Sequence, residues 1–215
     1  MEERAALLSR VSADPGTEIR DPATGEVIGR VAFGTPGDVA AAVDAAAKAQ
    51  PGWAALDDQE RCDALMRAAD AIDAHAEELA YMVSREQGKT MNGLGARYEA
   101  AGCAAWVRAT ASTPLPVEVL VDDGNSHAEL HYRPIGVVGA ITPWNWPMII
   151  ACWQIAPALR MGNTVVQKPS EYTTLTGLAI AAVLNDRDEG HRGVGGEHAP
   201  AHPGAWRQRR GHRAA

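Results

Sequence analysis

The sequence predicts an α/β fold built on an incomplete parallel sheet, and three neighbouring segments carry this prediction. Two short β-branched runs lie at 136–141 and 164–166. The apolar segment 148–161 between them is long enough for three helical turns. A strand, a helix and a second strand within roughly 30 residues form a βαβ unit, which makes the two strands parallel neighbours.

Polar side chains follow both predicted strands. Asn145 comes shortly after the first strand, and Lys168 and Glu171 follow the second. Ligands of parallel sheets bind beyond the carboxyl ends of the strands. The order of elements therefore predicts a ligand site at this edge of the sheet.

The N-terminal half is predicted to hold a hairpin and then helices. Residues 16–33 alternate polar and apolar around Gly25, as in a hairpin with glycine in its turn. Asp38 is the expected N-cap of the first helix, and Pro51 its expected end. Further helices are expected from Asp57 or Asp58 onward, over 76–86 before Gly88, and over 93–111. The expected inward-facing residues are Val39, Ala42, Val43 and Ala46, then Cys62, Leu65, Met66, Ala69 and Ile72, and finally Tyr98, Ala101, Ala105 and Trp106.

A second hairpin is predicted between residues 114 and 133. Residues 117–121 and 128–132 alternate around the polar turn 122–126. An isolated two-stranded hairpin is at best marginally stable in water. The pattern therefore hints at self-association through this element.

The motif residues resemble those of a known family. The segment 143–147 reads PWNWP and 156–171 reads APALRMGNTVVQKPSE, with shorter matches at 21–26 (DPATGE) and 86–89 (EQGK). Together they resemble the cofactor domain of the NAD(P)-dependent aldehyde dehydrogenase superfamily, over roughly residues 18–185. The resemblance implies an aldehyde-dehydrogenase-like, incomplete Rossmann-type parallel sheet with N-terminal helices and a projecting β-hairpin. It divides the chain into a helical part, an oligomerisation-type hairpin, a βαβα unit and a tail outside the family, at 1–113, 114–133, 134–185 and 186–215.

The resemblance assigns a catalytic role to Asn145. Its side-chain amide would donate to the oxyanion that forms when a thiolate adds to the aldehyde. On spacing alone, Asn145 could equally cap the helix that begins near Pro147.

The resemblance also implies NAD as cofactor. Lys168, Ser170 and Glu171 would contact the adenosine ribose, with the ammonium donating to the hydroxyls and the carboxylate accepting from them. The alternative for Lys168 and Glu171 is an exposed ion pair. A carboxylate at 171 would repel a 2′-phosphate, so NAD is expected over NADP. Ile141, Thr142, Pro143 and Trp144 would line the nicotinamide side mainly through backbone groups.

The thiolate and the general base of the family reaction have no counterpart in this sequence. Cys62, Cys103 and Cys152 lie on apolar helical stripes, outside the Gly-Gln-x-Cys setting of the family's nucleophile. The Glu-Leu-Gly-Gly-Lys setting of the general base is also absent. The chain alone is therefore expected to be inactive; the alternative is a non-catalytic remnant that binds nucleotide weakly or pairs with a full-length subunit.

The composition changes abruptly after residue 185. Residues 186–215 contain six Arg and four of the seven His, but no Leu, Ile, Phe or Met, which predicts disorder. Translated one base out of frame, 205–213 permits the Gly-Val-Asn-Val-Val-type strand that the family would place next. We interpret the tail as a frameshift product before residue 205; a natural tail is the alternative.

Charge and composition exclude several classes of protein. A net charge of −7 argues against general binding to nucleic acid or anionic membranes. The three cysteines show no metal-binding or CxxC spacing, and no metal site is expected among the tail histidines. No run of eighteen apolar residues occurs. These features favour a cytoplasmic protein. The family resemblance implies a small-molecule aldehyde as substrate and a homo-oligomer formed through the 114–133 hairpin.

Overall fold

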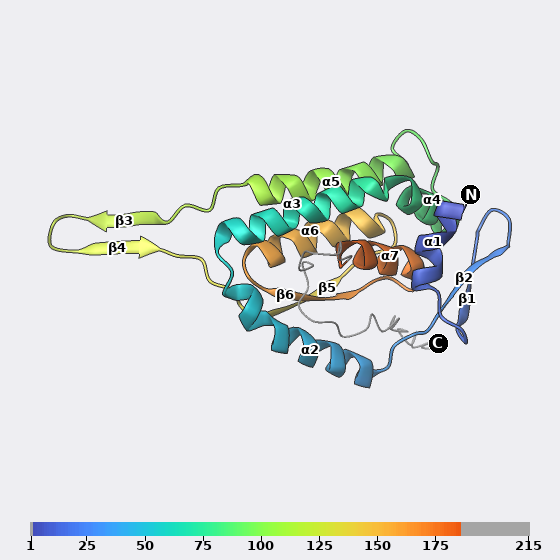
Figure 1. The fold of residues 1–215 in the computed structure, drawn as a ribbon, viewed down its shortest axis with the longest axis horizontal. Coiled ribbons are helices and arrows are strands. Elements are labelled where there is room, and N and C mark those ends of the chain that lie inside the picture. The colour runs from blue at the N-terminus through green and yellow to red at the C-terminus, as the bar shows by residue number, and fades with distance from the viewer. Residues whose placement is uncertain (1, 186–215) are drawn as a thin grey trace, which may run out of the picture.

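A computed structural model describes residues 2–185 of the chain (Figure 1), so the predictions made for 186–215 lie outside the described residues. Seven helices and six strands occur in this part. In chain order they are α1 (Glu2–Val11), β1 (Thr17–Arg20), β2 (Val27–Val31), α2 (Pro36–Ala54), α3 (Asp58–Ala74), α4 (Ala76–Gln87), α5 (Ala96–Ser112), β3 (Glu118–Asp122), β4 (His127–Leu130), β5 (Val137–Ile141), α6 (Pro147–Arg160), β6 (Thr164–Lys168) and α7 (Thr174–Leu184).

The expected βαβ unit is present, and its two strands are parallel. Strand β5 pairs with β6 in a continuous register from Val137 opposite Thr164 to Ile141 opposite Lys168. The backbone N–H of Thr142 extends the pairing by donating to the carbonyl of Lys168 at 3.1 Å. Both strands therefore end at the same edge, as the sequence pattern predicts.

Asn163 fixes the opposite end of this unit. Its buried side-chain oxygen accepts from the backbone N–H groups of Ile135 and Gly136 at 2.7 and 2.9 Å, and its amide donates to Ala158 at 3.1 Å. The preceding Gly162 adopts a φ of +80°, which only glycine takes without strain. The Gly-Asn pair thus turns the chain from α6 into β6 and aligns the two strands.

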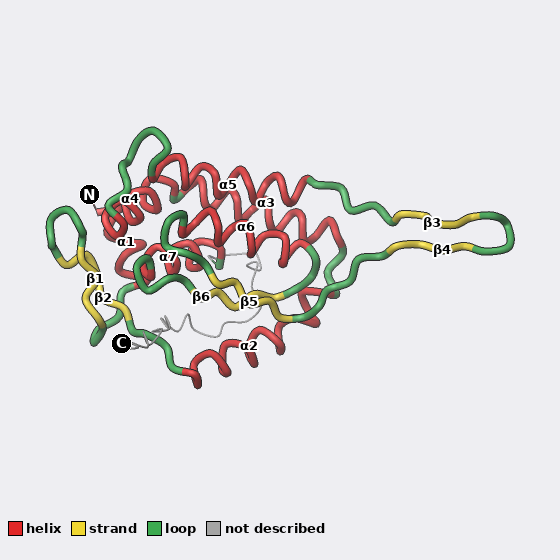
Figure 2. The backbone as a smooth tube through the Cα atoms, turned by 180° about the vertical axis from the view of Figure 1, so that it is seen from behind, coloured by secondary structure: helices red, strands yellow, loops and turns green. Residues whose placement is uncertain are grey.

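Helices cover both faces of the two-stranded sheet. Figures 1 and 2 show α6 and the α3–α5 layer on one side and α2 on the other. Helix α2 is tied to the βαβ unit by hydrogen bonds from Trp53 to the carbonyl of Leu159, at 2.8 Å, and from Thr164 to the carbonyl of Ala46, at 2.9 Å. The main apolar core lies where α3, α5 and α6 pack together, around Leu65, Ile72 and Cys103.

Three details of the helices differ from the sequence-based expectations. Thr35, and not Asp38, caps α2; Asp38 completes a capping box at the third helical position. Pro51 lies inside α2, which ends at Ala54. A proline in a helix removes its own N–H donor to the carbonyl four residues earlier, and α2 continues for three residues beyond Pro51 in spite of this loss. Met66 of α3 and Val43 of α2 are also 39% exposed instead of inward-facing.

The buried face of α5 was predicted wrongly. Tyr98 is 52% exposed and Trp106 41% exposed, and Ala101 and Ala105 are exposed as well. The face that is buried instead consists of Ala96, Glu99, Ala100, Cys103, Ala104, Val107 and Ala111. A glutamate in the middle of this stripe hid the helical periodicity, because charged residues are rarely fully buried without a partner.

The second predicted hairpin is present as β3 and β4, which pair antiparallel with an irregularity between Val119 and Val121. Figure 1 shows it projecting from the body of the molecule. Every residue of both strands is exposed, including Leu120 at 58%. A role for this hairpin in oligomerisation remains a prediction.

A buried glutamate holds α7 against α4. The carboxylate of Glu86 accepts from the backbone N–H groups of Leu175 and Thr176, both at 2.8 Å, and from the Thr176 hydroxyl at 2.6 Å. These N–H groups belong to the first turn of α7 and have no partner within the helix. Burial raises the pKa of Glu86 to about 7, while the three hydrogen bonds act in the opposite direction.

This pKa predicts how stability depends on pH. In the folded state the pKa of Glu86 is about 7, above its ordinary value of 4.5. The folded chain therefore binds more protons than the unfolded chain between these pH values, and stability falls as pH rises through this window. Relative to Glu86→Gln, we expect the free energy of unfolding of the wild type to decrease by about 3 kcal/mol between low pH and pH 8.

Urea unfolding between pH 4 and pH 8 measures this difference. Glu86→Gln cannot titrate and should be less stable at low pH, since its amide replaces an acceptor that faces backbone donors. The exposed Glu118→Gln is the control, and its stability should run parallel to that of the wild type. If the free energy of unfolding varies with pH in the same way in the wild type and in Glu86→Gln, the raised pKa assigned to Glu86 is wrong.

Candidate functional site

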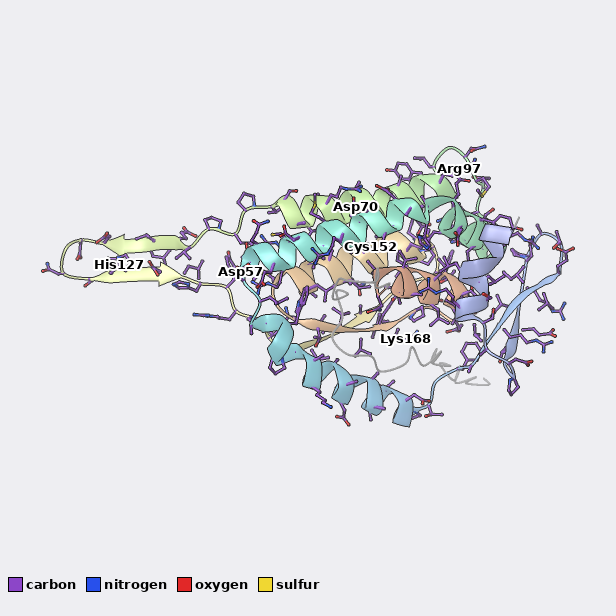
Figure 3. All side chains as sticks on the ribbon, viewed as in Figure 1. Asp57, Asp70, Arg97, His127, Cys152 and Lys168 are labelled. Carbon is purple, nitrogen blue, oxygen red and sulfur yellow. The ribbon has the colours of Figure 1, made fainter. Side chains whose placement is uncertain are left out.

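A hollow lies at the edge where β5 and β6 end. It has a volume of about 290 Å³. Its lining residues come from the loops after the two strands and are Thr142, Pro143, Trp144, Lys168, Ser170, Glu171 and Tyr172. Figure 3 shows Lys168 at the strands of the sheet. Six of the eight residues predicted for the site line this hollow; Ile141 and Asn145 do not.

Lys168 and Glu171 provide the charges of the hollow. Both side chains are partly buried, and no ion pair joins them within residues 2–185. The alternative interpretation of a surface ion pair is therefore not supported. An ammonium and a carboxylate that face one hollow separately can serve as donor and acceptor for a ligand's hydroxyl groups.

Ser170 has a clear local role in addition. Its hydroxyl accepts from the N–H of Tyr172 at 3.3 Å, and its carbonyl accepts from the N–H of Thr173 at 3.1 Å and from the hydroxyl of Thr174 at 3.2 Å. These bonds shape the turn between β6 and α7. Ser170 thereby stabilises the turn that carries Lys168 and Glu171.

The loop after β5 presents different groups. The hydroxyl of Thr142 is buried and has no hydrogen-bond partner within the described part of the chain. The side chain of Ile141 is 69% exposed, outside the hollow, and its carbonyl accepts from Gln154 at 3.2 Å. The Thr142 hydroxyl is therefore available for a hydrogen bond with a ligand.

Asn145 lies three residues after Thr142 and is exposed. Its carbonyl accepts hydrogen bonds from Lys89 at 2.9 Å and Gln87 at 3.0 Å. Its side-chain amide forms no hydrogen bond with any described residue. Trp146, and not Asn145, is the N-cap residue of α6, and it makes no side-chain capping bond. The capping interpretation of Asn145 is therefore wrong, and its amide can bind a ligand.

Glu99 caps α6 in place of Asn145. Its fully buried carboxylate accepts from the N–H groups of Met148 and Ile149 at 2.8 and 3.3 Å, and from the ammonium of Lys89 at 2.5 Å. Lys89 also lies 3.9 Å from the centre of the Trp146 ring. The sequence contained two signals for this arrangement: the short family match at 86–89 and a glutamate inside an otherwise apolar stripe.

Two of the three cysteines, Cys62 and Cys103, have raised pKa values. Cys103 and Cys152 are buried between α5 and α6, and Figure 3 shows Cys152 within the helical layer. Burial raises the pKa of Cys103, and a hydrogen bond with Cys152 adds to the effect. Burial also raises the pKa of the partly exposed Cys62. Because the thiolate is the reactive form, these shifts oppose nucleophilic chemistry at neutral pH.

Comparison with known proteins identifies the family of this chain. A model of the aldehyde dehydrogenase family matches residues 10–190. The chain belongs to the aldehyde dehydrogenase family. It is 38% identical over 184 residues to phenylacetaldehyde dehydrogenase of Pseudomonas fluorescens, covering 79% of this chain and 36% of that protein. It is 39% identical over 163 residues to a betaine aldehyde dehydrogenase of Cereibacter sphaeroides, covering 76% of this chain and 34% of the relative.

Solved structures of the family share the fold. Lactaldehyde dehydrogenase from Escherichia coli superposes with a TM-score of 0.73 at 34% identity, covering 80% of this chain and 36% of that one. Glyceraldehyde-3-phosphate dehydrogenase from Methanocaldococcus jannaschii in complex with NADP gives 0.74 at 28% identity, covering 80% and 38%. The chain thus spans about a third of the length of its aldehyde dehydrogenase relatives. Within residues 2–185, no helix is long and apolar enough to cross a membrane.

Proposed function

We propose that this protein takes part in the oxidation of an aldehyde to a carboxylic acid with NAD. Asn145 acts as the oxyanion donor, and Lys168 and Glu171 bind the adenosine ribose. The observation that supports this most directly is that the Asn145 amide has no hydrogen-bond partner among residues 2–185 and follows the strand end beside the hollow. That hollow contains Lys168 and Glu171, which form no ion pair with each other in the same part of the chain.

The proposed catalytic contribution of Asn145 is electrostatic. When a nucleophile adds to an aldehyde, the carbonyl oxygen gains negative charge, and an oriented amide N–H stabilises that charge without reorganising. Removal of one such donor elsewhere costs about 3–4 kcal/mol. The Asn145 side chain fits this role because its backbone is fixed by two hydrogen bonds while its amide remains available.

The hollow fits one nucleoside of NAD better than the whole cofactor. Its volume of about 290 Å³ lies at the lower limit of small-molecule sites. Lys168 and Glu171 suit a pair of ribose hydroxyls, and the buried hydroxyl of Thr142 can take a further hydrogen bond. Bound NAD would supply the hydride acceptor of the reaction. A carboxylate at 171 disfavours the 2′-phosphate of NADP, which supports NAD as the preferred cofactor.

We further propose that the chain alone does not oxidise aldehydes. All three of its cysteines sit in helices, and the pKa values of Cys62 and Cys103 are raised. None of them has the environment of an activated nucleophile. Three free thiols also suit a reducing compartment such as the cytoplasm.

Association through the β3–β4 hairpin is a second candidate function. Val119, Leu120 and Val121 are 53, 58 and 41% exposed on a two-stranded element that projects away from the core (Figure 1). Such an element is marginal by itself and gains stability when another strand or subunit packs against it. The proposed partner is a second copy of this chain or a full-length subunit of the family.

The first prediction concerns activity. The purified chain should form no NADH above background from several aldehydes at millimolar NAD, because no thiolate is available to form the covalent adduct. Asn145→Ala should give the same background. Turnover that disappears in Asn145→Ala would refute inactivity, and Cys152→Ser would then be the first variant made to find the nucleophile.

The second prediction concerns cofactor preference. Binding of NAD should be weak but measurable by ligand-observed NMR, and NADP should bind less well. Glu171→Gln should weaken NAD binding about tenfold, because a charged hydrogen bond is lost. It should also reduce the difference in affinity between NAD and NADP. Glu118→Gln on the exposed hairpin is the control and should change neither affinity. Equal binding of NAD and NADP by the wild type would exclude the role given to Glu171.

The third prediction concerns the hairpin. The wild-type chain should self-associate at micromolar concentration in sedimentation velocity, and Leu120→Lys should weaken association at least about tenfold by placing a charge in the contact. Val27→Lys in the other hairpin is the matched control, since Val27 is also exposed, at 43%. A monomeric wild type, or equal loss in both variants, would refute pairing through β3 and β4.

A further inference from the structure

We propose that Lys89, held in place by Glu99, is a positioning residue for Asn145. Lys89 fixes the backbone of the loop that carries the oxyanion donor, and Glu99 attaches this loop to the first turn of α6. This inference rests on the proposed function only in the use made of Asn145; the attachment itself is a property of the described residues.

Lys89 contacts the loop at two consecutive residues. Its ammonium donates to the carbonyl of Asn145 at 2.9 Å and lies 3.9 Å from the centre of the Trp146 ring. The side chain is only 12% exposed, so water competes little for these contacts. Gln87 adds hydrogen bonds to the carbonyls of Trp144 and Asn145 at 2.7 and 3.0 Å. The segment after α4 therefore holds the loop from one side.

Glu99 explains why an ammonium can be placed there. A buried ammonium is stable only when a counter-charge and further hydrogen bonds offset its lost hydration. The Glu99 carboxylate is fully buried, 2.5 Å from Lys89, and its other oxygen accepts from the first turn of α6. One carboxylate thus neutralises Lys89 and caps the helix that starts immediately after the loop.

These contacts matter for Asn145 because the hydrogen bonds from Lys89 and Gln87 to its carbonyl are the only ones that hold it within the described residues. Its side chain makes no hydrogen bond there, so the direction of its amide depends on the position of its own backbone. An oxyanion donor works only when it is already oriented, and displacements near 1 Å lower rates about 100-fold elsewhere. Lys89 and Gln87 therefore set the geometry of the donor without contacting the substrate.

Lysine suits this position better than a neutral residue or arginine. Its three N–H donors radiate from one atom, so they reach the Glu99 carboxylate, the Asn145 carbonyl and the Trp146 ring face together. A planar guanidinium directs its donors within one plane. A neutral side chain would leave the Glu99 carboxylate buried without its counter-charge.

Hydrogen exchange measured by mass spectrometry tests the proposal. In Lys89→Met, amides of the peptide 142–150 should exchange roughly tenfold faster than in the wild type, whereas the α3 peptide 64–72 should be unchanged. The control is Arg97→Met, which removes the exposed ion pair between Arg97 and Glu77 at the start of the same helix as Glu99. It should leave both peptides unchanged. No acceleration in 142–150, or equal acceleration in both peptides, overturns the proposal.

A spectroscopic measurement distinguishes loss of the direct contact between Lys89 and the Trp146 ring from a general loss of rigidity in the fold. With 5-fluorotryptophan incorporated, the resonance of Trp146 is assigned by its loss in Trp146→Phe. Lys89→Met should shift this resonance, because it removes the cation from the ring face, while the resonance of Trp53 in α2 stays in place. An unmoved Trp146 resonance overturns the contact.

A double variant covers the case in which Lys89→Met does not fold. Lys89→Met with Glu99→Gln leaves no unpaired buried charge, and it should fold and still show the faster exchange in 142–150. If the peptide 142–150 of the folded double variant exchanges at the wild-type rate, the proposal is overturned. None of these measurements uses nucleotide or aldehyde, so their outcome is independent of whether the proposed oxidation is correct.

Discussion

Two buried carboxylates, Glu86 and Glu99, determine how this chain is assembled. Each projects from a helix of the N-terminal half and accepts hydrogen bonds from the first turn of a helix that follows a strand: Glu86 at α7 and Glu99 at α6. The first N–H groups of a helix lack internal partners, and each of these two carboxyl groups accepts hydrogen bonds from two of them. The same bonds that satisfy these groups therefore join the βαβ unit to the helical layer.

This arrangement also limits how the site can bind ligands. In many nucleotide-binding folds, helix N-termini next to the sheet edge bind phosphate. Here Glu99 already accepts hydrogen bonds from first-turn N–H groups of α6, and Glu86 does the same at α7. Lys168 is the cation among the residues that line the hollow. The proposed cofactor site is thus better suited to the hydroxyl groups of a ribose than to the phosphates of a dinucleotide.

The sequence predicted the sheet well because its pattern there follows simple rules. The two β-branched runs and the intervening apolar segment have the lengths of a buried βαβ unit, and β5 and β6 are the parallel neighbours that this unit predicts. It failed at α5, where the buried Glu99 interrupts the apolar stripe. It also missed Lys89, since a lysine in a loop normally indicates an exposed side chain. Both errors concern one ion pair, whose two members lie on different segments, so neither segment alone reveals it.

The unpaired edges of the sheet connect the fold to the proposed inactivity. Within residues 2–185, β5 and β6 pair only with each other, so each strand has one outer edge of backbone groups without sheet partners. Ile141, the last residue of β5, is 69% exposed, although strand ends in a complete parallel sheet are normally covered on both faces. A cleft for a dinucleotide needs walls on both sides of the strand ends, and β5 and β6 contribute one such wall. Residues 2–185 thus contain the proposed oxyanion donor Asn145 and the proposed ribose-binding residues Lys168 and Glu171, but they do not form a second wall that would enclose a substrate against them.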